Sequence, residues 1–293
     1  MRKFSWPLIK RKANALCALT KRTANALCAL ILMLPALAVA QGQTSIEVRA
    51  KHVIDDAIAA LGGDKFLKME DRIESGRAYS FYHERLSGLS VATIYTRYLT
   101  PTEGKTGDEL AVRERQAFGK YEELGYVLFR EDGAWEVTFR GAKDLDMDRI
   151  DRYRDTTLRN IFYILRIRLG ERGLIFESKG ADVVENQPVE IVDITDSQNR
   201  VVTVYFHQDS KLPVRQSMVW RDPKTHDRNE EVTRFARYQD AGGVRWPHQI
   251  MRERNGDKVY QIFSDSVSIN RGVSDSAFAV PTGPAERVTV KKK

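Results

Sequence analysis

Three aspartates at alternate positions, Asp144, Asp146 and Asp148, form the most metal-like pattern in the sequence. This spacing matches the first three ligand positions of a twelve-residue calcium loop. The sixth position, however, is Arg149 where such a loop needs glycine, and the twelfth is Asp155 where it needs a bidentate glutamate. Acidic residues at the start of a helix, stabilised by the helix dipole, explain the triplet better. We therefore predict no metal ion and no cofactor.

Patterns that could supply a nucleophile or a base are equally weak. The segment Gly88-Leu89-Ser90-Val91-Ala92 is similar to a hydrolase nucleophile elbow, but that elbow needs a strand before the serine and a helix after it. Here the segment opens a strand. The five histidines lack the spacing of metal ligands: His52, His83, His207, His226 and His248. The sequence predicts a protein that is not an enzyme, and a secreted hydrolase is the least favoured alternative.

A cluster of arginines is the remaining group that could bind a ligand. Arg166, Arg168 and Arg172 could together meet an anionic head group. Charged runs of this kind more often form the solvated face of a helix, and we favour that interpretation.

The basic residues of the chain are concentrated at its start. Residues 1–40 hold seven Lys or Arg and no Asp or Glu, followed by an apolar stretch that ends in Ala38-Val39-Ala40. This order is typical of a cleavable secretory signal peptide. The whole chain has 47 basic and 40 acidic residues, so removing the seven leaves 40 of each. A neutral mature chain does not favour nucleic-acid binding, which needs a basic surface.

Both cysteines, Cys17 and Cys28, also lie in the signal segment. The mature chain therefore has no disulfide and no thiol chemistry. An exported chain without disulfides fits the bacterial periplasm, where we place the protein. We predict a signal peptide over residues 1–40, one domain over residues 41–283 and a basic, flexible tail over residues 284–293.

Hydrophobic periodicity predicts one helix followed by a long series of strands. Apolar residues recur at helical spacing from Ile46 to Leu61, after a capping box over residues 44–47, and Gly62-Gly63 ends the helix. From Arg72 the period changes to two. The expected strands are 72–82, 89–98, 110–118, 126–130, 134–139, 174–179, 188–195, 200–207, 213–221, 229–238, 244–254 and 258–269. Short turns between them indicate an antiparallel meander, and the absence of strand–helix–strand alternation excludes a doubly wound fold.

The strands alternate so that one face of the sheet is apolar. Among the residues we place on this face are Trp135, Val137, Val204, Phe206, Met218 and Trp220. A sheet with one apolar face must close, pair with another sheet or be covered. Two helices are expected in the middle of the chain, over residues 146–153 and 155–169, and the longer one presents Leu158, Ile161, Phe162 and Leu165 as one stripe. This longer helix and the N-terminal helix are the two expected covers of the sheet. The fold class is mainly β (α+β), a curved antiparallel sheet or unclosed β-barrel (half-pipe) covered by helices.

Several short motifs occur in an order that resembles a known family. They are Ala60-Leu61-Gly62-Gly63, the segment 205–214 that leads to Leu212-Pro213, the run Gly242-Gly243-Val244-Arg245-Trp246-Pro247, Asn255-Gly256, and the closing Val267-Ser268-Ile269-Asn270 followed by Asp275, Phe278 and Val280-Pro281. In this order they resemble the bacterial outer-membrane lipoprotein carrier family (LolA-like), with its lipoprotein-sorting relatives. The resemblance extends over about Ser45 to Pro281, which is essentially the mature chain.

The resemblance implies an apolar concave face that accepts acyl chains of a lipoprotein or lipid, and transfer partners in the inner and outer membranes. The expected acyl-chain cavity is lined by Leu158, Ile161, Phe162, Leu165, Trp135, Val137, Val204, Phe206, Met218 and Trp220. The segment 72–139 is longer and more polar than expected of compact carriers, with Arg113, Glu114 and Arg115 consecutive. This departure indicates a divergent relative with another cargo.

Two non-catalytic functions remain open from the sequence. In the first, the protein is a periplasmic carrier or binder of acyl chains. In the second, the same fold is a structural or interaction protein of the cell envelope, and the apolar face is filled by the protein's own side chains. An internal apolar cavity of several hundred Å³, the usual size of ligand pockets, would distinguish them.

Overall fold

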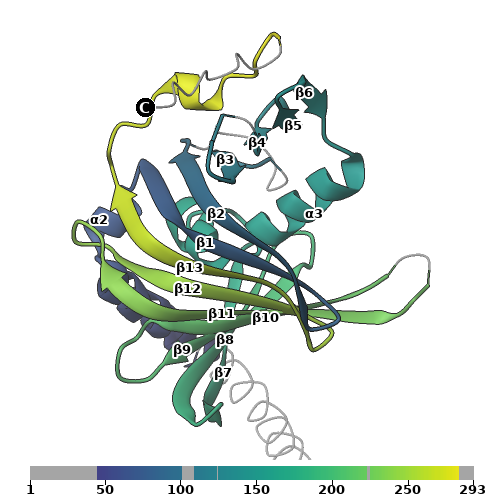
Figure 1. Cartoon of the computed structure of the whole chain (residues 1–293). Coiled ribbons are helices and arrows are strands. Elements are labelled where there is room, and N and C mark those ends of the chain that lie inside the picture. Colours follow the sequence, from purple (N-terminus) through teal and green to yellow (C-terminus); the bar gives the residue numbers. More distant parts are fainter. Residues whose placement is uncertain (1–44, 101–108, 124, 223–224, 284–293) are drawn as a thin grey trace, which may run out of the picture. The chain divides into compact units, whose positions relative to one another are not determined.

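The computed structural model describes residues 45–100, 109–123, 125–222 and 225–283 (Figure 1). The chain divides into two compact units, Met1–Arg49 and Ala50–Lys293. Of the first unit, residues 45–49 are described and are helical, and all the described strands belong to the second unit. The predicted signal segment, residues 1–40, and the predicted tail, residues 284–293, lie outside the described residues. Within the described parts of the chain, no helix is long and apolar enough to cross a membrane.

Thirteen strands of the described residues form one antiparallel sheet. The strands are β1 (Asp71–Tyr82), β2 (Arg85–Tyr98), β3 (Val112–Phe118), β4 (Gly125–Arg130), β5 (Gly133–Thr138), β6 (Gly141–Asp144), β7 (Ile175–Val184), β8 (Gln187–Thr195), β9 (Val201–His207), β10 (Pro213–Arg221), β11 (Arg228–Asp240), β12 (Arg245–Arg254) and β13 (Asp257–Ile269). The twelve predicted strands are all present, with ends shifted by a few residues, and β6 is additional. The predicted antiparallel, unclosed and curved sheet is confirmed (Figure 1).

The order of the strands joins two meanders. It runs β6-β5-β4-β3-β2-β1-β13-β12-β11-β10-β9-β8-β7, so that β1 pairs with β13, from Arg72 beside Ile269 to Ser80 beside Tyr260. The two edges differ in length, because β6 has 4 residues and β7 has 10. Because neither edge strand pairs with another described strand, the barrel stays open.

The helices are short, apart from the one over residues 45–61. The others are α2 (Asp64–Leu67), α3 (Met147–Leu158), α4 (Ile161–Tyr163), the π-helix η1 (Ile164–Arg168) and the 3₁₀ helix η2 (Asp275–Phe278). The predicted helix start at Asp155 is wrong. The side chain of Asn160 instead accepts hydrogen bonds from the backbone N–H groups of Phe162 and Tyr163 and caps α4, while Asp155 lies inside α3 and pairs with Arg159.

The main core lies between the helices and one face of the sheet. Apolar side chains of residues 50–61, α2, α4 and η1 pack on β8, β9, β11 and β12. The ring of Phe162 in α4 lies 5.0 Å from that of Phe235 and 4.7 Å from that of Trp246. We call the side of the sheet that carries Val204, Phe235 and Trp246 the covered face, and the other side the outer face. The predicted helical cover is confirmed (Figure 1).

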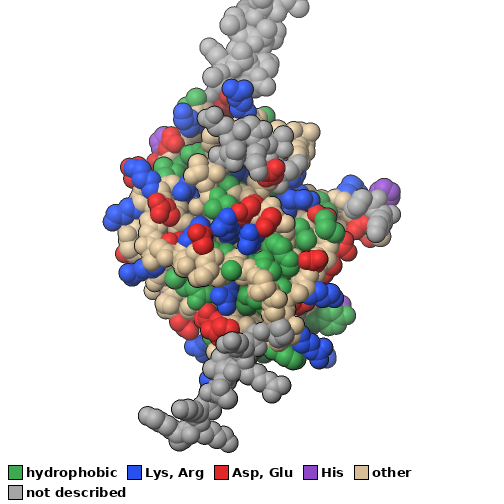
Figure 2. All heavy atoms as spheres, turned by 90° about the horizontal axis from the view of Figure 1, so that it is seen from above, with side chains coloured by type: hydrophobic (Ala, Val, Ile, Leu, Met, Phe, Trp, Pro, Cys, Tyr) green, Lys and Arg blue, Asp and Glu red, His purple; other side chains and the backbone are tan. Residues whose placement is uncertain are grey.

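Charged side chains of both signs lie close together on the surface. On the face seen in Figure 2, acidic and basic side chains of the described residues are interspersed with hydrophobic ones. This mixture agrees with the equal numbers of basic and acidic residues after Ala40.

The junction between the two meanders depends on a glycine. The register of β1 on β13 shifts between Ser75 and Gly76. A Cβ at Gly76 would lie 2.1 Å from the carbonyl oxygen of Phe263 and 2.7 Å from the Cα of Ser264. Both neighbours are backbone atoms of the partner strand, so a side chain at this position would push the two strands apart.

We expect Gly76→Ala to lower the free energy of unfolding by about 1–3 kcal/mol, because the added methyl overpacks a strand pair. Urea unfolding followed by circular dichroism measures the change. Gly170→Ala is the matched control: its Cβ would have no atom within 4 Å, so it should leave stability unchanged or slightly higher. Equal stability of Gly76→Ala and the parent chain would contradict the close approach of β1 and β13.

Candidate functional site

Five of the ten residues predicted to line an acyl-chain cavity come together in the main core. Ile161, Phe162 and Leu165 come from the cover, while Val204 and Phe206 come from β9. All five are buried, with exposed fractions of 3% or less. They pack against one another and against residues 50–61, so the apolar part of the covered face is occupied by the protein's own side chains.

Three more of the predicted residues lie elsewhere. Leu158 packs with Val112 and Tyr163 in a smaller cluster. Trp135 packs with Leu128 and Phe278, and Val137 follows it on the same side of β5. The sequence placed Trp135 and Val137 on the covered face, and this placement is wrong.

The strand register explains the difference. Glu114 of β3, which lies on the covered face, is paired with Phe129, and Phe129 is paired with Ala134, so Trp135 points to the outer face. There the C-terminal segment around η2 covers it. The period-two pattern shows that Trp135 and Val137 share one side of β5, but it does not show which face of the sheet that side belongs to.

The last two predicted residues, Met218 and Trp220, line an open groove of about 740 Å³. Its walls are α3 on one side and strands β10 to β12 on the other. Besides these two residues, the lining consists of Asp151, Arg152, Arg154, Asp155, Thr156, Gln198, Arg200, Asp222, Asn229, Glu231 and Arg254. The groove therefore has a small apolar floor between charged walls.

Ion pairs neutralise much of the charge on the sheet side of the groove. Glu231 is 3% exposed, and its carboxylate accepts from Arg254 at 3.0 Å and lies 3.3 Å from Arg252. The guanidinium of Arg254 also lies 6.0 Å from the centre of the Trp220 ring. A cation over the face of an indole is a favourable contact, and it positions Trp220 in the groove.

The helical wall carries charges of both signs. Arg159 donates to Asp155 at 2.6 Å, and Arg154 pairs with Asp151. Burial raises the pKa of Asp155, and the neighbouring Arg159 opposes this effect. Among the described residues Arg152 has no ion-pair partner, so it is the cation of this wall that is available to a ligand.

The apolar floor leads from the groove to the edge of the main core. Trp220, Met218 and Gln216 alternate along β10 and share its covered face. Arg159 Nη1 lies 3.3 Å from the sulfur of Met218. Gln216 accepts a hydrogen bond of 3.0 Å from the backbone N–H of Ile161, the first residue of α4. The line of side chains therefore ends under the cover.

The other half of the covered face is polar, which the sequence did not predict. Arg72, Thr96 and Glu114 lie side by side on β1, β2 and β3. Arg72 donates to Thr96 at 3.0 Å and stacks over Trp246 at 4.2 Å, while Glu74 accepts from Ser264. Burial raises the pKa of Glu114. The consecutive charges at positions 113–115 were the sequence signal, but the sequence does not show which residues pair with them, such as Thr96 of β2, which donates to Glu114 at 3.3 Å.

The sequence motifs that suggested chemistry have structural roles. Asp146 caps α3 by accepting from the backbone N–H of Arg149 at 3.0 Å, and Ser90 lies inside β2 with no helix after it. The interpretation of the arginine cluster as solvated is wrong for Arg168, which is 4% exposed and pairs with Glu171 and Asp196. Nowhere in the described ranges do three or more His, Cys, Asp or Glu residues form a group that could hold a metal ion.

Comparison with solved structures identifies the fold. A DUF1329 family protein from Desulfovibrio piger matches with a TM-score of 0.54 and 14% identity, over 78% of this chain and 97% of that chain. A putative outer membrane lipoprotein-sorting protein domain from Vibrio parahaemolyticus (TM-score 0.46, 12% identity) and a LolA superfamily protein from Nitrosomonas europaea (0.47, 9%) match over the same shares. The chain shares its fold with the DUF1329 family protein.

At these identities the comparisons describe the fold alone. No protein-family model matches the sequence, and a search of curated proteins finds no match. The resemblance predicted from the sequence motifs is thus confirmed at the level of fold.

The raised pKa of Glu114 predicts a pH dependence of stability. Its folded-state pKa is raised above the ordinary value of 4.5, so the unfolded chain ionises first as the pH rises, and the folded state loses stability above about pH 4.5. Glu114→Gln removes this loss. The variant should therefore gain melting temperature relative to the parent chain between pH 4 and pH 8, measured by thermal unfolding.

Glu123→Gln provides the control for this experiment, because Glu123 is exposed. Its melting temperature should follow that of the parent chain at every pH. A difference between Glu114→Gln and the parent that does not change with pH would contradict the raised pKa.

Proposed function

We propose that the protein is a non-catalytic binder or carrier of acyl chains in the bacterial cell envelope. The ligand is an amphiphile, either a lipid or the lipid-modified end of a lipoprotein. Its polar head lies in the groove under α3, and its acyl chain follows β10 onto the covered face.

One observation carries the proposal. The groove of about 740 Å³ has Met218 and Trp220 as its floor, and this floor continues through Gln216 to the first residue of α4. A ligand with a polar head and an apolar chain fits a site whose walls are charged and whose floor leads to an apolar interior. Arg152, which has no ion-pair partner among the described residues, is the cation placed to meet an anionic head.

The covered face supplies the free energy for chain binding once the cover moves. Each buried methylene contributes about 0.8 kcal/mol, so a 16-carbon chain offers on the order of 10 kcal/mol before ordering costs. Part of this gain replaces contacts that Ile161, Phe162 and Leu165 already make. Net affinity therefore depends on the cost of displacing α4 and η1.

The cover has a local structure that suits such a movement. Its chain is divided at Asn160, where α3 ends and α4 begins. Residues 164–168 form a π-helix, a form that is rare and frequently occurs at functional sites. A helix that is already interrupted can be displaced as a short segment while α3 stays in place.

The envelope location rests on the sequence. Residues 1–40 have the layout of a secretory signal peptide, and this prediction places the mature chain in the periplasm. Partners in the inner membrane, which deliver the ligand, and in the outer membrane, which receive it, complete the proposed cycle.

A second function is favoured by a different observation. The main core is filled, with Trp246, Phe206 and Leu165 each 2% exposed or less. A filled interior is expected of a structural or interaction protein of the envelope that binds no acyl chain. Binding measurements separate the two functions.

Trp220→Ala tests the groove. Titration of the purified protein with a fluorescent 16-carbon fatty acid should give at least fivefold weaker binding, because the variant loses the largest apolar side chain of the floor. Val219→Ala is the matched control on the same strand: Val219 is 47% exposed, on the outer face, and does not line the groove. Absence of binding by the parent chain would favour the second function, and equal affinities of the parent and Trp220→Ala would exclude the groove.

Leu165→Ala tests the cover. Removing this fully buried side chain should lower the free energy of unfolding by about 2–5 kcal/mol. If the cover must move to admit an acyl chain, the variant should also bind the fatty acid about threefold or more tightly. The reason is that the open conformation, which binds the chain, becomes more populated when the cover is less stable. Leu169→Ala, at a position that is 36% exposed, should change neither quantity. A less stable Leu165→Ala with unchanged affinity would contradict a moving cover.

A further inference from the structure

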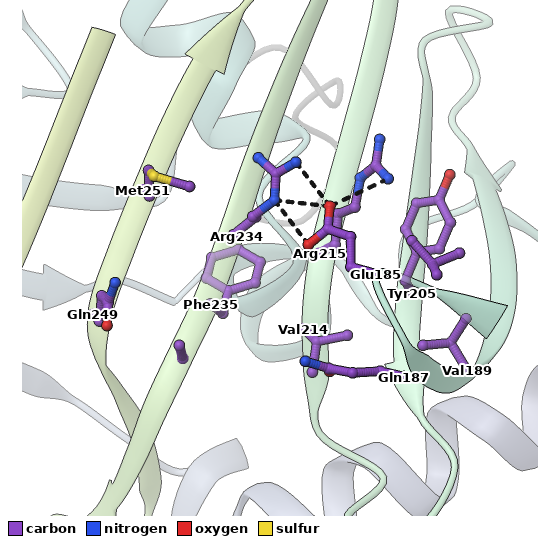
Figure 3. A pocket seen from close by; sticks show the side chains of 12 residues that line it. Glu185, Gln187, Val189, Tyr205, Val214, Arg215, Arg234, Phe235, Gln249 and Met251 are labelled. Carbon is purple, nitrogen blue, oxygen red and sulfur yellow. Dashed lines mark hydrogen bonds and ion pairs between the residues drawn. The ribbon is translucent and has the colours of Figure 1, made fainter. Parts of the chain in front are cut away.

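A second cavity lies on the outer face of the sheet, beneath the hairpin of β7 and β8 (Figure 3). Its volume is about 180 Å³. Tyr205 of β9 lines it, and Tyr205 alternates with Val204 and Phe206, which point into the main core. Most of its lining therefore belongs to the outer face of the sheet, although Phe235, whose side chain packs in the main core, also lines it.

The hairpin tip closes one side of this cavity. Glu185 lies at the turn between β7 and β8, and its carboxylate reaches past β9 to Arg215 on β10 and Arg234 on β11 (Figure 3). Glu185 and Asn186 have φ values of 53° and 62°, as a two-residue hairpin turn requires. The turn thus places a carboxylate between two guanidinium groups.

The two arginines differ in how many hydrogen bonds their guanidinium groups donate. Arg234 donates to Glu185 from Nε at 2.9 and 3.1 Å and from Nη2 at 2.8 Å, and its Nη1 pairs with Glu253 at 2.6 Å. The pairing holds the pKa of Glu185 below its ordinary value. Arg234 is therefore held by two carboxylates, although its buried Nη1 meets Glu253 as an ion pair without hydrogen-bond geometry.

Arg215 makes fewer interactions than Arg234. Its Nη1 lies 3.8 Å from Glu185, too far for a hydrogen bond. Its buried Nε has no hydrogen-bond partner, and among the interactions of the described residues its side chain donates none. The guanidinium rests on the Tyr205 ring at 4.9 Å, which orients it beside the cavity. A buried donor without an acceptor is unfavourable, so this guanidinium has unused hydrogen-bonding capacity.

We propose that this cavity is a binding site for a small aliphatic monocarboxylate. The carboxylate accepts hydrogen bonds from Arg215, as guanidinium groups bind carboxylates through two parallel donors. The chain lies against Val184, Val189, Val214 and Met251. A volume of 180 Å³ equals that of about six water molecules, which matches a chain of about five carbons. The site is independent of the acyl-chain function.

Methyl NMR of the intact protein with ¹³C-labelled methionine tests the site, with pentanoate as the probe. Met251 lines the cavity and Met218 lines the groove, so each reports on one site. Pentanoate should shift the Met251 methyl signal in a saturable manner and leave Met218 unchanged, while pentanol, which lacks the carboxylate, should shift neither. A shift of Met218 alone would assign the binding to the groove and overturn the proposal.

Substitutions at Arg215 and Ala236 test which residues of the cavity bind pentanoate. Arg215→Met should weaken pentanoate binding at least tenfold, whereas Arg221→Met, at the exposed end of the same strand, should bind like the parent chain. Ala236→Leu fills the cavity without changing any charge, because Ala236 lines it, and should also abolish binding. No saturable Met251 shift in the parent chain, or equal affinity in Arg215→Met, would overturn the proposal.

Discussion

An antiparallel sheet that curves without closing leaves one large apolar face that must be kept from water. In this protein that requirement falls on residues 50–61, α2, α4 and η1, whose apolar side chains fill the covered face over β8 to β12. Both the cover and the groove lie on this face of the sheet. Since the cover contributes so few residues, each of them bears a large share of the burial.

The covered face is divided into two chemically different halves. Beneath α4 and η1 it is apolar, whereas on β1 to β3 it carries Arg72, Thr96 and Glu114. The groove under α3 lies where charged residues such as Glu231 and Arg254 meet the apolar line of Trp220 and Met218. An amphiphile has the same division, with a charged head beside an apolar chain. This match supports the proposed ligand, which has both parts, over a plain hydrocarbon.

The strands and their antiparallel order could be predicted because period-two alternation and turn residues are local signals. The break of the cover at Asn160 was missed, because a residue that caps a helix through its side chain also occurs inside helices, and apolar spacing continues across it. The faces of Trp135 and Val137 were misassigned because the segment that covers them, around Phe278, is distant in sequence. Strand pairing and register decide which face of the sheet a side chain lies on, and neither can be read from the sequence of one strand.

The polar half of the covered face was missed for the same reason. Arg72 looks like any charged residue at the start of a strand until Trp246 is found beneath it. Likewise, Arg168 reads as part of a solvated run, yet it lies buried between Glu171 and Asp196. A charged side chain can be buried when an oppositely charged or polar partner from another element contacts it. The sequence contains these partners but does not show which of them are in contact.

The pairing of β1 with β13 has a consequence for how the chain reaches its native state. The first strand of the sheet has its second neighbour nearly two hundred positions later, as in the contact between Arg72 and Ile269. Contacts at such separation form slowly, because a long loop must close before they are gained. Until the last strand is synthesised, β1 and β12 both have open edges, so a ribosome-bound or truncated chain holds two unjoined meanders that could pair wrongly with other chains. The C-terminal strand therefore completes folding, and its arrival converts two exposed half-sheets into one.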